Sequence, residues 1–119
     1  IKELNLEDRF IILPTNNHIQ DFYSAFDIFA FPSRFEGLGM AAVEAQISGV
    51  FCILSDNVPQ EARISKRTFF LPLKVENWIK TIKSYHYENQ RNDVFSKKYD
   101  IHNCAIQLEK IYKENSDNK

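Results

Sequence analysis

Cysteine is scarce in this chain, and the two positions it occupies argue against two kinds of scaffold. Cys52 lies inside an apolar run and Cys104 lies in a helix-like stretch near the end of the chain. Two such cysteines do not form a disulfide framework, and no cysteine–histidine spacing resembles a zinc site. We therefore expect two buried, reduced thiols, no bound metal and a cytoplasmic protein.

An excess of charge of either sign is also absent. Fifteen basic side chains face sixteen acidic ones, so the net charge is −1. This balance provides no electrostatic argument for nucleic acid or for an anionic membrane surface as a partner. No apolar run approaches the roughly 20 residues of a membrane-spanning helix. With 44% hydrophobic and 26% charged residues, the composition is that of an ordinary globular protein.

The length predicts a single domain. A chain of 119 residues can bury one core but not two. The first residue is Ile1 rather than methionine, and no charged-then-apolar leader opens the chain. We therefore expect residues 1–119 to be a piece of a longer protein. Residues 114–119 are polar and are expected to fray.

Short apolar runs predict four buried strands separated by helices. Helical spacing of apolar residues predicts helices over 19–26, 40–48 and 75–82, a less regular one over 89–99, and a last one capped by Asp100. Gly49 stands where a helix ends. Strands that are apolar on both faces predict an α/β protein with a Rossmann-like parallel sheet and helices on both faces. The four runs are Arg9–Leu13, Ile28–Phe31, Val50–Leu54 and Thr68–Leu71.

The loop after the second run has the strongest signal for a binding site. Ligands of such sheets bind beyond the carboxyl ends of the strands, and here Gly37-Leu38-Gly39 opens a helix at that place. Glycines allow a ligand to approach the backbone, and the N–H groups at a helix start attract phosphate or sugar oxygens. The same glycines would also suit an ordinary strand–helix turn.

Two glutamates, Glu36 and Glu44, flank this helix start. A glycoside hydrolase holds its two carboxylates roughly 5–9.5 Å apart, whereas eight helical residues rise about 12 Å. The spacing therefore disfavours a hydrolase. It suits two contacts spread along an extended ligand such as a sugar diphosphonucleoside.

The residues from Phe26 to Gly39, followed by Glu44 and Ala45, resemble the signature of retaining GT-B glycosyltransferases. The family is glycosyltransferase family 4, also called glycosyl transferases group 1, and Glu36 and Glu44 match its pair of glutamates with seven residues between them. The continuation through Asp56 is similar to members that build bacterial capsule and exopolysaccharide. The resemblance implies the C-terminal, nucleotide-sugar-binding part of a GT-B fold.

The resemblance also implies a role for individual residues. Glu36 would hold a donor-sugar hydroxyl at the reacting centre as the catalytic residue, and Glu44 would bind the ribose. Backbone amides of Gly37, Leu38 and Gly39 would contact the donor sugar and diphosphate, and Asn16 and Asn17 would lie near the base. Donor binding in the family is commonly independent of metal, and no other cofactor is implied. Pro14 or Thr15 stands where the family often has glycine, which leaves the base-binding loop open.

The implied activity is transfer of a sugar, with retention, from a nucleotide donor to a saccharide or lipid-linked acceptor in bacterial surface polysaccharide synthesis. The donor would be UDP-linked, and the full-length hexosyltransferase would be cytoplasmic or at the inner face of the membrane. The family's diphosphate-binding arginine and lysine, and its acceptor domain, would precede Ile1, so the isolated piece is expected to be inactive. A GT-B-fold sugar-nucleotide epimerase and a non-catalytic nucleotide-sugar-binding module remain alternatives.

Overall fold

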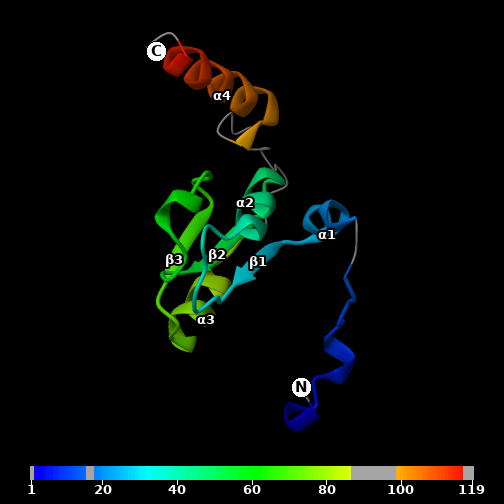
Figure 1. Cartoon of the computed structure of the whole chain (residues 1–119). Helices are drawn as coiled ribbons and strands as arrows, with labels where there is room; N and C mark the ends of the chain where they lie inside the picture. The colour runs from blue at the N-terminus through cyan, green and yellow to red at the C-terminus, as the bar shows by residue number, and fades with distance from the viewer. Residues whose placement is uncertain (1, 16–17, 87–98, 117–119) are drawn as a thin grey trace.

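The computed structural model describes residues 2–15, 18–86 and 99–116 of the chain, with side-chain burial assigned as far as residue 114. Its centre is a three-stranded parallel sheet in the order β1-β2-β3 (Figure 1). The strands are β1 (Ile28–Phe31), β2 (Phe51–Ser55) and β3 (Thr68–Leu71). Ile28 of β1 is level with Phe51 of β2, and Cys52 is level with Thr68 of β3. Because the strands are parallel, their carboxyl ends meet at one edge of the sheet.

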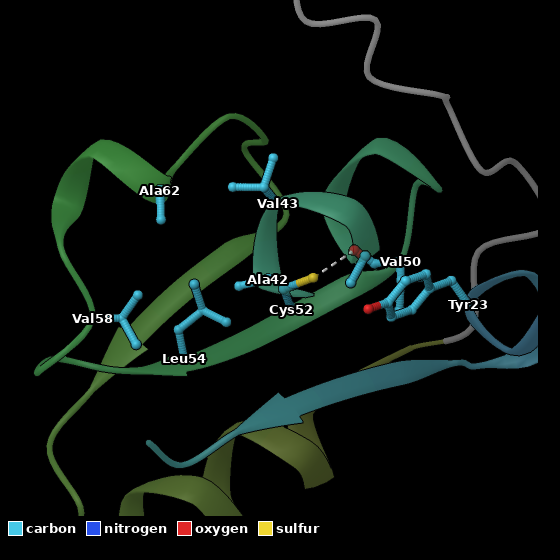
Figure 2. Packing of buried hydrophobic residues seen from close by; sticks show 9 residues of the cluster. Tyr23, Ala42, Val43, Val50, Cys52, Leu54, Val58 and Ala62 are labelled. Atoms are coloured by element: carbon cyan, nitrogen blue, oxygen red, sulfur yellow. Dashed lines mark hydrogen bonds between the residues drawn. The ribbon is translucent and has the colours of Figure 1, made fainter. Parts of the chain in front are cut away.

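Helices cover both faces of this sheet, which confirms the predicted Rossmann-like α/β fold. The helix α2 (Met40–Ile47) lies over one face and α3 (Val75–Ser84) lies under the other (Figure 2). A shorter helix, α1 (Ile19–Ala25), precedes β1 and contacts α2. A 3-10 turn, η3 (Gln60–Ala62), connects β2 with β3 on the α2 side.

The core lies between the sheet and α2 (Figure 2). Alternate residues of β2 point to opposite faces of the sheet, so Cys52 and Leu54 face α2. Small alanines on the buried side of α2 allow the helix to approach the strands closely. The buried members of the cluster are Tyr23, Ala42, Val43, Ala45, Val50, Cys52, Leu54, Val58 and Ala62.

The end of α2 is a Schellman motif, as the position of Gly49 predicted. Gly49 has φ 73°, its N–H donates to the Gln46 carbonyl at 3.0 Å, and the Val50 N–H donates to the Ala45 carbonyl at 3.2 Å. Only glycine adopts this left-handed conformation at no steric cost. The turn directs the chain from α2 into β2.

The predicted strand over Arg9–Leu13 is wrong. Arg9 ends the short turn η2 (Glu7–Arg9), and the following residues belong to no strand of the described sheet. Ile11 and Ile12 are 85% and 82% exposed. An apolar run needs burial, but it becomes a strand only where a neighbouring strand accepts its backbone hydrogen bonds. None of the described strands does so here.

The last helix, α4 (Ile101–Ser116), begins at the predicted cap, because the Asn103 N–H donates to the Asp100 carboxylate at 2.9 Å. It projects from the sheet, as do residues 2–15 at the other end of the chain (Figure 1). The radius of gyration is accordingly 18.0 Å, against about 13.5 Å for a compact domain of this length. The expected burial of Cys104 is therefore wrong: its helix does not pack on the sheet, and the thiol is exposed, while Cys52 is buried.

Three expectations are not decided. Most of the helix expected over residues 89–99 lies outside the described residues. The assignment of residues 1–119 to one domain and the fraying of residues 114–119 stay predictions, although α4 continues to Ser116.

Candidate functional site

The loop from Pro32 to Gly39 leaves the carboxyl end of β1 and leads into α2, as the sequence predicted. Gly39 occupies the N-cap position of α2, and no side chain caps the helix there. The first amides of an α-helix have no acceptor within the helix, and they carry the positive end of its dipole. The start of α2 can therefore accept an anion at the edge of the sheet where ligands of such folds bind.

The two glycines of this loop differ in what the fold requires of them. Gly39 is buried, has φ 78°, and a Cβ on it would lie 3.4 Å from the side chains of Phe31 and Val58. Gly37 is exposed, and a Cβ on it would meet no atom within 4 Å. The fold therefore explains Gly39. It does not explain Gly37, whose backbone is open to approach from outside.

Glu36 is half-buried beside this loop and is held by a serine. The Ser33 hydroxyl lies 3.0 Å from Glu36 Oε1 and 3.0 Å from the Phe35 carbonyl oxygen, so its one proton is shared between them. These bonds fold the loop back on itself and fix the Glu36 carboxylate next to Gly37. Phe35 and Arg34 are exposed at the tip of the loop. Leu38 is partly buried and packs against the core, so its backbone is anchored.

Glu44 lies on the exposed side of α2, about 7.5 Å along the helix from Gly39. The Tyr23 hydroxyl, from α1, donates a hydrogen bond to Glu44 Oε2 at 3.1 Å. The pKa of Tyr23 is raised to about 12, mainly because the phenol is buried and also because the Glu44 carboxylate is close. Tyr23 is thus a protonated donor at physiological pH.

A hollow of about 310 Å³ opens between α1 and α2 beside this pair. Its lining is apolar apart from a few polar groups, one of which is the Glu44 carboxylate. The residues that line it are Ile19, Gln20, Tyr23, Glu44, Ile47 and Ser48. Asn16 and Asn17, the other predicted donor-binding residues, precede α1 and lie outside the described residues.

Sequence reasoning missed Gln46, which is fully buried in α2. Its amide nitrogen donates to the carbonyls of Ala42 at 2.9 Å and Ala62 at 2.8 Å. Its amide oxygen accepts from the N–H groups of Ile64 and Ser65 and from the Thr68 hydroxyl, at 2.8–3.1 Å. The side chain therefore ties α2, which carries the site, to the segment leading into β3. A glutamine among the alanines of a core-facing helix was the available signal.

A larger hollow, about 400 Å³, lies far from the glycine loop. Phe51, Phe69 and Tyr85 contribute aromatic rings to it; the Phe51 ring lies 5.1 Å from that of Phe69 and 5.0 Å from that of Tyr85, tilted by 31° and 52°. It lies at the amino ends of β2 and β3, opposite the edge where the Pro32–Gly39 loop emerges. Size alone therefore does not indicate the site, and the sheet geometry carries more weight.

The fold and the loop define a Rossmann-like α/β protein with an uncapped, glycine-bearing helix start at the carboxyl edge of its sheet. The profile of the family described as glycosyl transferases group 1 matches residues 1–115. The chain belongs to this family, which confirms the resemblance at the level of the family.

Several curated proteins are similar to parts of the chain. It is 33% identical over 86 residues to "Putative glycosyltransferase EpsF" of Bacillus subtilis (strain 168), covering 68% of this chain and 22% of that protein. It is 39% identical over 54 residues to UDP-Gal:alpha-D-GlcNAc-diphosphoundecaprenol alpha-1,3-galactosyltransferase of Escherichia coli, covering 45% and 14%. Over 56 residues it is 34% identical to the lipopolysaccharide core biosynthesis mannosyltransferase LpsB of Rhizobium meliloti (strain 1021), covering 47% and 16%.

The chain thus aligns with about a fifth or less of each of these relatives. No solved structure matches it. Among the described residues, no helix is both long and apolar enough to cross a membrane.

Proposed function

We propose that this chain is the nucleotide-sugar-binding part of a retaining glycosyltransferase that uses a UDP-linked donor. One observation carries the proposal: the uncapped start of α2 stands at the carboxyl edge of the sheet, with Glu36 in the loop just before it and Glu44 farther along the helix. The diphosphate of the donor would lie against the amides of residues 37–41. As the bond between the sugar and the diphosphate breaks, negative charge grows on the diphosphate, and the helix dipole would stabilise it.

The two glutamates would divide the remaining contacts. Glu36, fixed by Ser33 beside Gly37, would hold a hydroxyl of the donor sugar close to the reacting carbon. Glu44, farther along α2, would accept hydrogen bonds from the ribose hydroxyls. Membership of the family and the names of the relatives support a transferase over a sugar-nucleotide epimerase or a binding-only module. The names of two relatives, a lipopolysaccharide core enzyme and an enzyme acting on a diphosphoundecaprenol-linked sugar, also support a role in bacterial surface polysaccharide synthesis. The acceptor would be a saccharide or a lipid-linked sugar, and the full-length enzyme would act in the cytoplasm or at the inner face of the membrane.

The division of roles is tested by steady-state kinetics of the full-length enzyme with varied donor. A ribose contact is similar in ground and transition states, so Glu44→Ala should raise the KM for the donor and leave kcat nearly intact. A hydrogen bond to a charged group contributes roughly 1.5–3 kcal/mol, or about one to two decades in KM. Glu36→Ala should instead depress kcat far more than it changes KM, because its contacts tighten in the transition state.

Glu109→Ala is the matched control, since Glu109 is an exposed glutamate on α4, the helix that projects from the sheet. It should change neither constant. An exchange of the two effects would show that the roles are reversed. If both site variants behaved like Glu109→Ala, the glycosyltransferase site would not be here. This chain alone should bind UDP-sugar weakly and show no turnover, because the acceptor site would belong to the rest of the enzyme.

A further inference from the structure

Tyr23 links two elements that both border the candidate site. It lies in α1, and its hydroxyl reaches the Glu44 carboxylate on α2, 21 positions later in the chain. The tyrosine is only 4% exposed, whereas Glu44 is an exposed residue. The pair therefore joins a buried, fixed donor to a carboxylate that faces solvent and the hollow between α1 and α2.

The ring of Tyr23 is held by two aromatic neighbours. Phe26 and Phe29 contact it edge to face, with centroids 6.2 Å and 5.7 Å away and interplanar angles of 82° and 79°. Edge-to-face packing restricts the ring to one orientation. Its hydroxyl is therefore directed to one place on the surface of α2, and Glu44 occupies that place.

A hydrogen-bond donor of this kind can order a carboxylate at the surface before a ligand binds. The free glutamate side chain samples several rotamers, and binding a ligand requires that one of them be selected. A hydrogen bond to Oε2 selects the rotamer in advance. It leaves Oε1, and further acceptor capacity on Oε2, for the two neighbouring hydroxyls of a ribose.

We propose that Tyr23 is a positioning residue that orders the Glu44 carboxylate for the ribose of the nucleotide donor. The inference deepens the proposed function and depends on Glu44 holding the ribose. Tyr23 itself does not touch the ligand. The competing role is purely structural, in which the hydroxyl only fastens α1 to α2. Substitution alone does not separate the two roles, because both predict a weaker site when the hydroxyl is removed.

The test is a binding cycle on the full-length enzyme with Tyr23→Phe, Glu44→Ala and the double variant. Tyr23→Phe keeps the packed ring and removes only the hydroxyl. Isothermal titration with UDP, GDP and ADP first identifies the tightest of the three ligands. The dissociation constant for that nucleotide and for its 2′,3′-dideoxy form is then measured with each variant. Tyr85→Phe is the matched control, since its ring packs against Phe51, with the centroids 5.0 Å apart, at the opposite edge of the sheet.

The positioning role predicts that Tyr23→Phe raises the dissociation constant of the nucleotide about three- to tenfold, the range expected for ordering one side chain. It predicts that Tyr23→Phe changes the affinity for the dideoxy nucleotide little. In the Glu44→Ala variant, adding Tyr23→Phe should cause no further loss of affinity for the nucleotide. Tyr85→Phe should bind like the parent. Equal weakening of both nucleotides by Tyr23→Phe, or full additivity with Glu44→Ala, would show that the hydroxyl serves only the fold.

Failure of the proposed function would look different. If Glu44→Ala left the affinity unchanged, or if none of the three nucleotides bound the parent enzyme, the donor site itself would be misplaced. If Glu44→Ala weakened binding but Tyr23→Phe did not, the ribose contact would stand and only the positioning role would be refuted.

Discussion

The three glycines of the chain offer a direct way to separate what the fold needs from what a ligand needs. Gly39 and Gly49 have φ of 78° and 73°, where a residue with a side chain is strained, whereas no such conformation and no close neighbour restrict Gly37. Gly39 and Gly49 cap opposite ends of α2, and only Gly39 lies in the candidate site. Replacing each by alanine therefore gives three outcomes from one small set of variants.

The magnitudes follow from these conformations. A left-handed backbone costs a non-glycine residue roughly 1–2 kcal/mol, so Gly39→Ala and Gly49→Ala should each destabilise the fold by about that amount. For a domain of this size the thermal midpoint should fall by a few degrees. Gly37→Ala meets open space and should alter stability by less than about 0.5 kcal/mol. Its methyl group would, however, intrude where the donor approaches the backbone. An overpacked contact costs typically 1–3 kcal/mol, which is roughly a 5- to 150-fold loss of affinity.

The assay combines thermal unfolding of the full-length enzyme with titration of UDP-sugar or UDP. We expect Gly49→Ala to lower the midpoint and keep the affinity, Gly37→Ala to keep the midpoint and lower the affinity, and Gly39→Ala to lower both. Unchanged affinity in Gly37→Ala would refute the reasoning that the donor contacts this backbone. A midpoint as low in Gly37→Ala as in Gly49→Ala would refute the open placement of Gly37.

Three further predictions concern the core beside the site and the two cysteines. Gln46→Leu removes a buried amide and leaves the N–H groups of Ile64 and Ser65 without their acceptor, at a cost of about 1–3 kcal/mol each. Urea unfolding should therefore show that the free energy of unfolding falls by about 2–6 kcal/mol. A fall below about 0.5 kcal/mol would contradict the hydrogen-bond network around Gln46. At pH 8 a thiol reagent should modify the exposed Cys104 in the folded protein and should modify Cys52 only after unfolding, because burial raises the pKa of Cys52 to about 12. Equal rates of modification of the two thiols would contradict their placement. Because the folded state keeps the Cys52 proton that the unfolded chain releases above about pH 9, this stabilisation is complete below pH 9 and is lost between pH 9 and 12. Cys52→Ala should flatten that part of the stability profile, and an unchanged slope would show that another group controls it.

Much of the arrangement was predictable because it depends on local pattern. Three of the four apolar runs became parallel strands, with β2 shifted by one residue, and Gly49 and Asp100 mark helix ends where they were expected. Side-chain periodicity and the conformational preference of glycine act within a few residues, so they can be read without the fold. The position of Gly37-Leu38-Gly39 at the carboxyl edge follows from the same strand–loop–helix order.

Other features depended on partners that no local pattern identifies. The apolarity of Arg9–Leu13 is local, but a strand also needs a neighbour, and the described sheet supplies none. The helical periodicity of α4 is a local property, but whether that helix packs on the sheet depends on the tertiary structure. Because α4 does not pack there, Cys104 is exposed. Gln46 and Tyr23 look like ordinary helical residues until the fold brings Thr68 within 2.8 Å of one and Glu44 within 3.1 Å of the other. The sequence by itself determined the three strands of the sheet, the helix ends at Gly49 and Asp100 and the candidate loop through short-range preferences. Only the tertiary structure decided which polar groups meet, because those contacts join residues about 20 positions apart.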